Sequence, residues 1–184
     1  GRRANWHLGL ADEADIGPIQ HLVDTVSFDF VGDNETITEV YGLDLTVADY
    51  VRSYRQLRQR VRVVPHITVG LHAGRIVGER RAIALLQEMG LDALVFIVLI
   101  PTRGTRYESV SPPAPKQVAE LIAHARTAMP DVPLYLGCMR PAGAYREALD
   151  PLALDAGVNK IVHPSAAARQ RASKLGLRAI WQDE

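Results

Sequence analysis

The segment VRVVPHITVGLHAGRIVGE, residues 61–79, decides the fold class. It begins with β-branched residues typical of a buried strand, turns through Gly70, Gly74 and Gly78, and continues as a helical pattern from Glu79. Glycine lets a backbone approach a ligand closely, and the first turn of a helix offers unpaired N–H groups. The order strand, glycine-rich turn, helix therefore predicts either a ligand-binding loop or an ordinary βα turn.

The same alternation of strand and helix extends over the rest of the chain. Strand patterns cover 6–11, 23–31, 61–69, 91–100, 133–139 and 159–162, and helix patterns cover 12–22, 46–60, 79–89, 116–128, 144–156 and 165–176. The run LDALVFIVLI, residues 91–100, is typical of a strand buried on both faces of a parallel sheet. About six βα units result, against the eight of a closed barrel. We therefore expect an α/β fold, a partial (β/α) barrel forming one domain over residues 1–184.

Composition excludes several classes of protein. The chain has 184 residues and a formal net charge of zero, so no electrostatic argument favours nucleic acid or a membrane surface as a partner. We expect no transmembrane helix and no signal peptide, because no apolar run is long enough. Cys138 is the single cysteine, so an internal disulfide cannot form and a cytoplasmic setting is expected. One cysteine also cannot hold an iron–sulfur cluster by itself.

Ligands of such folds bind at the carboxyl ends of the strands, so the polar residues there are the candidates. They are Ser27, Asp29, His66, Thr68, His72, Thr102, Arg103, Gly104, Thr105, Cys138, Arg140 and His163. Asp29 is expected on the opposite side of its strand from Phe28 and Phe30. There it can accept hydrogen bonds from ribose hydroxyls, or it can pair with an arginine or backbone N–H groups. Arg140 is either an anion anchor or the partner of a carboxylate.

Three further features have a structural and a functional interpretation. His66, His72 and His163 can converge on one metal ion, as in barrel hydrolases, but no two of them form a metal-binding pair on one helix. We therefore predict no metal site and expect hydrogen-bonded structural histidines. Cys138 is expected to be a buried, inert thiol rather than a nucleophile. The arginines of the 46–60 helix and its end are expected to form a solvated face.

Four segments, taken in order, resemble the radical SAM superfamily. GRIVGE (74–79) resembles the GxIxG segment that packs against the adenine of S-adenosylmethionine, and residues 27–29 stand where that family has its ribose-contacting motif. PTRGT (101–105) resembles the P-x-x-G-T turn of biotin synthase, and residues 136–162 resemble the seventh strand, helix and eighth strand of the same group. The set is most similar to the two-subunit type of lipoyl synthase, which is biotin-synthase-like.

The resemblance implies S-adenosylmethionine as cofactor and a transferase that inserts sulfur at an unactivated carbon after a 5′-deoxyadenosyl radical has removed hydrogen. The implied cofactor-binding residues are Ser27, Asp29, Gly74, Ile76, Gly78, Thr102 and Gly104, and the implied substrate-binding residues are His66, Thr105 and Arg140. Glu79 would fix the loop rather than touch substrate. No catalytic residue is assigned.

The chain departs from the family in one respect, because the CxxxCxxC loop that holds the [4Fe–4S] cluster is absent. The cluster would have to come from another segment or chain, so whether this chain is an enzyme by itself stays open. It can be the carboxyl-terminal part of a radical SAM enzyme, a subunit that pairs with a cluster-bearing partner, or a non-catalytic module that dimerises or binds a partner. The implied substrate is a small molecule or a lipoyl domain, with no nucleic acid and no membrane partner.

Overall fold

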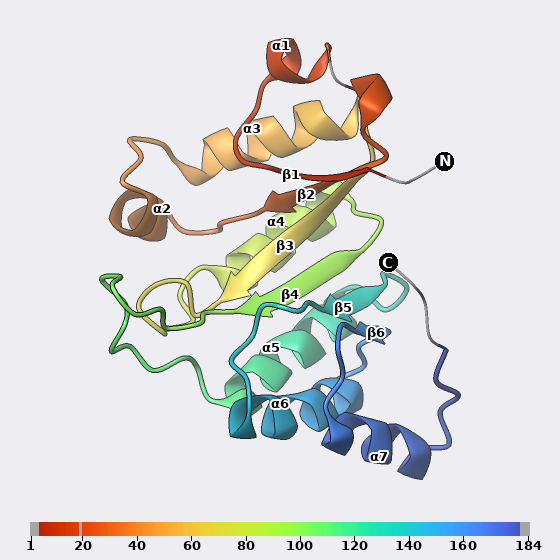
Figure 1. The fold of residues 1–184 in the computed structure, drawn as a ribbon. Helices are drawn as coiled ribbons and strands as arrows, with labels where there is room; N and C mark the ends of the chain where they lie inside the picture. The colour runs from red at the N-terminus through yellow and green to blue at the C-terminus, as the bar shows by residue number, and fades with distance from the viewer. Residues whose placement is uncertain (1–3, 19, 181–184) are drawn as a thin grey trace.

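A single parallel sheet organises the chain (Figure 1). The computed structural model describes residues 4–18 and 20–180. Its strands are β1 (Asn5–Leu8), β2 (Thr25–Asp29), β3 (Val63–Val69), β4 (Leu94–Val98), β5 (Leu134–Leu136) and β6 (Lys160–Ile161). Its helices are α1 (Glu13–Ile16), the 3-10 helix η1 (Gln20–Leu22), α2 (Asn34–Tyr41), α3 (Val47–Arg58), α4 (Glu79–Met89), α5 (Pro115–Ala128), α6 (Ala144–Asp155) and α7 (Ala166–Lys174). The six strands lie in chain order and each pairs in parallel with the next, so the predicted α/β partial barrel is confirmed.

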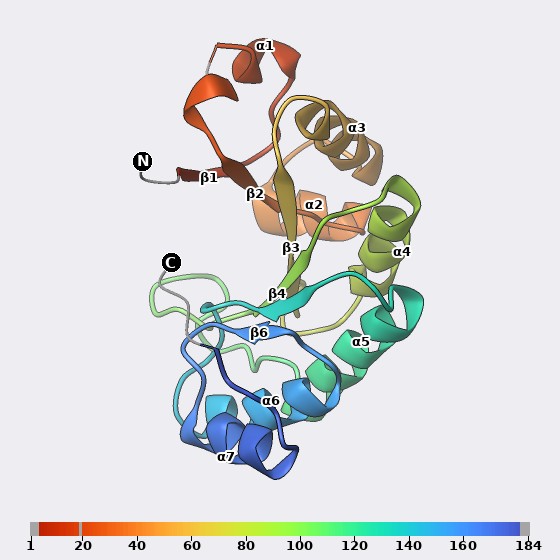
Figure 2. The ribbon, with the colours of Figure 1, turned by 90° about the vertical axis from the view of Figure 1, so that its right-hand side faces the viewer.

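The sheet is an open arc with helices on one side. In Figure 2 the helices α3 to α7 follow the outer side of this arc, and none of the helices in the described residues covers the opposite side. We call the two sides of the sheet the helix face and the open face. In a closed (β/α) barrel the equivalent of the open face would line the interior, so polar residues on it are candidates for ligand contact.

The helix face carries the main hydrophobic core. Phe28 of β2 and Phe30, just beyond the end of β2, are buried there, and their rings pack against two tyrosines of α3, with 5.9 Å between the ring centroids of Phe30 and Tyr54. Because successive side chains of a strand point to opposite faces, Asp29 lies on the open face, opposite Phe28 as predicted, and it is exposed. Strand β4 is buried along most of its length, as its apolar run predicts.

The helix α2 was not expected, because Gly32, Asp33 and Asn34 look like a chain break in the sequence. In the structure Asp33 is its N-cap and accepts a hydrogen bond from the backbone N–H of Thr36 at 2.7 Å. Gly42 ends the helix in the left-handed conformation. The same residue types that break a strand are therefore used here to begin and to end a helix.

Other elements differ from expectation mainly in length. The predicted helix over 12–22 is divided into α1 and η1, with Pro18 between them. The strand predicted over 133–139 keeps only Leu134–Leu136. Helix α3 begins with a capping box, in which Asp49 accepts a hydrogen bond from the Thr46 N–H at 2.8 Å. The arginines at 52, 55, 58, 60 and 62 are exposed, as predicted. In the described part of the chain no helix is both long and apolar enough to cross a membrane.

Candidate functional site

The glycine-rich loop, residues 70–78, connects β3 to α4 at the carboxyl edge of the sheet. Gly70 and Gly74 both have positive φ, at 79° and 78°, which L side chains rarely adopt. A short antiparallel bridge joins His72 to Arg75 and folds the loop back on itself. The loop is therefore a tight, hydrogen-bonded turn rather than an open strap.

The Glu79 carboxylate links the two ends of this loop by hydrogen bonds. Its two oxygens accept hydrogen bonds from the backbone N–H of Gly70 at 2.7 Å and of Val77 at 2.8 Å. Burial raises the pKa of Glu79 above its ordinary value, and these N–H groups act against that rise. The expectation that Glu79 fixes the loop agrees with these contacts.

The glycines of the loop are in close contact with other parts of the protein. A Cβ on Gly74 would lie 2.0 Å from the carbonyl oxygen of Ser111, and one on Gly78 would lie 2.5 Å from the Cβ of Asp33. A side chain at either position would clash with these atoms, which explains structurally why both residues are glycines. Of the loop residues assigned to cofactor binding, Ile76 is half-buried and its side chain packs against the main core. At Gly74 and Gly78, what the loop can offer a ligand is consequently its backbone.

A cavity beneath the loop is too small for an adenosyl group. It has a volume of about 20 Å³ and lies between the ends of β2 and β3 and the first turns of α2 and α4. That volume holds one water molecule. An adenosyl group in contact with Asp29 would bind on the open face instead, where this carboxylate is exposed.

The open face brings Asp29 and His66 together. Their Cα atoms are partners in the register of β2 and β3. His66 is half-buried, and its Nδ1 donates a hydrogen bond to the carbonyl of Val64 at 3.0 Å, so that Nε2 is the acceptor of the neutral ring. Burial lowers the pKa of His66, and its hydrogen bond to Val64 and the charge of Asp29 oppose this. The neutral imidazole is therefore the form present at neutral pH.

Two other residues of the open face are positioned by β1. Ser27 is buried, and its hydroxyl donates a hydrogen bond to the side-chain oxygen of Asn5 at 3.2 Å. His7 was not among the predicted site residues, yet its ring centroid lies 5.8 Å from that of His66. The alternation of side chains along β1 could have placed His7 on this face, because it pairs with Ser27.

The turn after β4 carries Thr102, Gly104 and Thr105, all of them exposed. The turn is held by its own hydrogen bonds: Thr105 Oγ1 donates to the Thr102 carbonyl at 2.6 Å, and the Gly104 N–H donates to Glu108 at 2.9 Å. It lies at the carboxyl end of β4, on the same edge of the sheet as the glycine-rich loop (Figure 1). Its position suits ligand contact.

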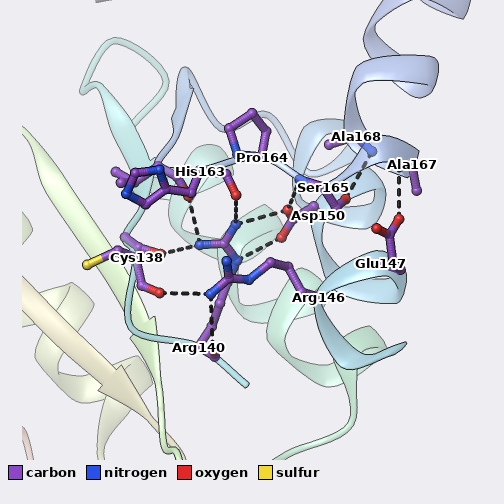
Figure 3. Close-up of polar contacts among 12 residues, drawn as sticks. Cys138, Arg140, Arg146, Glu147, Asp150, His163, Pro164, Ser165, Ala167 and Ala168 are labelled. Carbon is purple, nitrogen blue, oxygen red and sulfur yellow. Dashed lines mark hydrogen bonds and ion pairs between the residues drawn. The ribbon is translucent and has the colours of Figure 1, made fainter. Parts of the chain in front are cut away.

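Arg140 has a structural role, which corrects its assignment to substrate binding (Figure 3). Its side chain is 1% exposed and forms a bidentate ion pair with Asp150, at 2.8 and 2.9 Å. Its remaining N–H groups donate to the carbonyls of Gly137, Val162 and His163. All five N–H donors of the guanidinium are thus used inside the protein, which leaves none for a bound anion. Of the two roles open from the sequence, the structure shows the ion pair.

The prediction for Cys138 was wrong, because this thiol is exposed. Strand β5 ends at Leu136, so Cys138 lies in the loop beyond it, where its carbonyl accepts a hydrogen bond from Arg146 at 3.2 Å (Figure 3). The three histidines weighed as metal ligands are not grouped together. Among the described residues, His72 instead lies near two glutamates of α2, Glu35 and Glu39. Sequence reasoning missed that group, because α2 itself was not recognised.

Comparison with known proteins shows the fold. No protein-family model matches the sequence, and no curated protein matches it. The solved structure of methylornithine synthase (PylB) aligns with a TM-score of 0.64 and 15% identity, over 97% of this chain and 59% of that one. The solved structure of HydG, a maturase of the [FeFe]-hydrogenase, aligns with a TM-score of 0.59 and 15% identity, over 87% of this chain and 37% of that one.

The chain has the fold of part of these two larger proteins, a partial (β/α) barrel. It spans about three-fifths of methylornithine synthase and less than half of HydG. At 15% identity the likeness is one of fold alone. The fold agrees with the resemblance seen in the sequence, while the assignment to the radical SAM superfamily, and more narrowly to biotin and lipoyl synthases, stays a prediction.

Proposed function

We propose that this chain supplies the adenosyl-binding part of a radical SAM enzyme. The observation that carries the proposal is the fold, which aligns over 97% of the chain with methylornithine synthase. Asp29 supports it, because an exposed carboxylate at the end of β2 can accept hydrogen bonds from both hydroxyls of a ribose. The glycine-rich loop lies at the end of the neighbouring strand β3, where its backbone can lie against adenine.

The residues present suit an adenosyl group and do not suit an iron–sulfur cluster. Such a cluster takes several thiolates, and the chain has one cysteine, Cys138, beyond the end of β5. A [4Fe–4S] cluster would therefore be held by another segment or chain. The share of this chain is to bind and orient the nucleoside and to keep water away from it.

The substrate class that we propose is an apolar acyl chain, as in a two-chain enzyme similar to lipoyl synthase. Next to the polar residues of the open face lies a second hydrophobic cluster formed by Val64, Ala93 and Val95, with Ile97 and Tyr135 packed against it. An apolar wall of this kind suits an octanoyl chain carried on a lipoyl domain. His66 and Thr105 would be the polar contacts at its reacting end.

Calorimetry with 5′-deoxyadenosine and with S-adenosylmethionine tests the proposal. Both should bind with similar, modest affinity, because the methionine end has no iron to bind. Asp29→Asn should weaken binding of 5′-deoxyadenosine about 10-fold, as expected for loss of hydrogen bonds to a charged acceptor. Asp131→Asn, which changes another exposed aspartate, is the matched control and should bind like the wild-type chain.

Two results would contradict the proposal. One is no binding of 5′-deoxyadenosine at millimolar concentration. The other is tight binding of S-adenosylmethionine to the iron-free chain, because the site would then be complete without a cluster.

A second candidate function is a non-catalytic module that pairs with a copy of itself or with another chain. The observation in its favour is the open arc of the sheet, whose end strands β1 and β6 each pair on one side only. Unpaired edge strands are templates for pairing with another chain. This candidate needs no ligand on the open face, so the Asp29→Asn experiment distinguishes it from the first.

A further inference from the structure

Three side chains that commonly bind metals gather where α2 meets the glycine-rich loop. Glu35 and Glu39 lie four residues apart on α2 and so share one face of the helix. His72 reaches them from the glycine-rich loop. One ligand atom from each of the three side chains can be chosen so that all lie within 4.8 Å of one another. His72 is 2% exposed, while Glu39 is half-buried and Glu35 is exposed.

A chain of hydrogen bonds fixes which nitrogen of His72 carries the proton. The Thr36 hydroxyl donates its single proton to the Asp33 carboxylate at 2.7 Å. The same carboxylate oxygen also accepts a hydrogen bond from the backbone N–H of Thr36 at 2.7 Å, so it is the acceptor of the hydroxyl proton. The Thr36 oxygen lies 3.1 Å from His72 Nδ1 and can only accept there. His72 Nδ1 is therefore protonated.

With its proton on Nδ1, the neutral His72 ring presents a lone pair on Nε2. Facing that nitrogen at 3.4 Å is an oxygen of the Glu39 carboxylate, which is also an acceptor. Two acceptors that face each other repel unless a proton or a metal ion lies between them, and the His72 side of this pair is buried. The arrangement thus requires a positive charge at this point.

The surrounding charges favour a divalent ion over a proton. Asp33, Glu35 and Glu39 carry three negative charges, and Arg106, whose Nη2 lies 3.0 Å from Glu39 Oε1, contributes one positive charge. A net charge of two negative charges remains. A divalent cation neutralises both of them, whereas a single proton on His72 would neutralise one. The hydroxyl of Tyr107 also donates to Glu39 Oε1, at 3.2 Å, so this oxygen is occupied and Oε2 is left to bind an ion.

We propose that these residues form a site for a first-row divalent cation such as Mn²⁺, Fe²⁺ or Zn²⁺. The ligands are His72 Nε2 and the carboxylates of Glu39 and Glu35, with water at the remaining positions. For metal–ligand bonds of about 2.1 Å, a tetrahedral arrangement places two ligand atoms about 3.4 Å apart. That matches the distance between His72 and Glu39. Glu35 is exposed and needs only a rotation of its side chain to complete the set.

The bonds around the site resemble those around protein-bound metals. A metal-binding histidine usually donates its other ring N–H to an oxygen, as His72 does to Thr36. The ion would join α2 to the glycine-rich loop directly, and through Arg106 and Tyr107 it would reach the segment after β4. Its role is to hold these three segments at fixed positions.

Titration of the chelator-treated chain with Co²⁺ and with Zn²⁺ tests the site. We expect saturable, stoichiometric binding, a visible absorption band with Co²⁺ and a rise in Tm with either ion. Glu35→Gln should weaken binding at least about 10-fold and abolish the rise in Tm, with little effect on the metal-free fold because residue 35 is exposed. Glu88→Gln, which changes an exposed glutamate on α4, is the matched control and should bind like the wild-type chain.

The outcomes that overturn the proposal are equally direct. Binding that is unchanged in Glu35→Gln and Glu39→Gln would place the ion elsewhere. A site with three protein ligands should have a Kd below about 100 μM, so the absence of saturable binding of either ion at that concentration would exclude the site. Nitrogen chemical shifts of the His72 ring give an independent measurement. Protonation of both ring nitrogens in the presence of the metal would show that a proton holds the position instead.

Discussion

Glu79 is a single residue on which the glycine-rich loop depends. Its carboxylate accepts two backbone hydrogen bonds across the loop, one at each end. The negative charge also lies at the first turn of α4, where the helix dipole favours it. These contacts let a loop of several glycines keep one conformation.

Glu79→Ala should therefore destabilise the chain by about 2–4 kcal/mol, because buried N–H groups would lose a charged acceptor. Urea unfolding measures the change. Glu88→Gln, on the exposed side of the same helix, should stay within about 0.5 kcal/mol of the wild-type chain. An equally small effect of Glu79→Ala would mean that the loop holds its shape without this carboxylate.

At this scale the sequence predicted residues whose surroundings are local. Asp29 follows from the alternation of side chains along one strand, and Glu79 from its place at a helix start. Arg140 could not be assigned, because its partner Asp150 and the carbonyls around it come from elements that only the fold brings together. Cys138 was misplaced for a related reason, since its exposure depends on β5 ending two residues earlier.

Among the elements, α6 and α7 depend on the same buried carboxylate. Asp150 lies inside α6, pairs with Arg140 beyond the end of β5, and accepts a hydrogen bond from the N–H of Ser165 at 2.8 Å (Figure 3). Ser165 is in turn the N-cap of α7. One aspartate thus joins a strand end and two helices.

Asp150→Asn should cost about 3–5 kcal/mol, because Arg140 would remain as a buried, uncompensated charge. Chemical denaturation of the variant measures this. Asp155→Asn is the control, since its ion pair with Arg171 is much more exposed and should be worth at most about 1 kcal/mol. If Asp150→Asn costs no more than the control, the buried pair does not hold these elements together.

Helices and strands were predicted well in type and less well in extent. Helix α4 was found with both of its ends, because Gly90 stops it as the pattern indicates. Helix α2 was missed, because its first residues are also common in turns and its apolar face is short. Missing α2 in the sequence mattered, because two of the three proposed metal ligands lie on this helix.

On the scale of the whole molecule, the arc of strands is not closed. The strands β1 and β6 form its two ends, and β1 carries Trp6, which is 37% exposed. Fold class could be predicted from the alternation of elements, because each βα unit is local in sequence. Whether another chain covers the ends of the arc could not be predicted, because that depends on the surface of the other chain.

We predict that the isolated chain self-associates, because its edge strands and open face are uncovered. Light scattering should give a mass well above the 20.2 kDa of one chain. Trp6→Lys, which places a charge on the β1 edge, should shift the mass towards that of one chain. Leu152→Lys on α6, a position that is also 37% exposed, should not. A well-behaved monomer at high concentration would argue against the open edge as a binding surface.

The close approach of Gly32 to the backbone of Gly78 and Ala82 limits the substitutions that this chain can accept during evolution. A Cβ on Gly32 would lie 2.3 Å from the carbonyl oxygen of Gly78 and 2.6 Å from the backbone nitrogen of Ala82. Both obstacles are main chain, so trimming a neighbouring side chain cannot make room. A genetic screen for second-site suppressors of Gly32→Ala should thus yield true revertants at codon 32 and no compensating partner. Such positions leave no trace of covariation, and they are invisible to any method that infers contacts from paired substitutions.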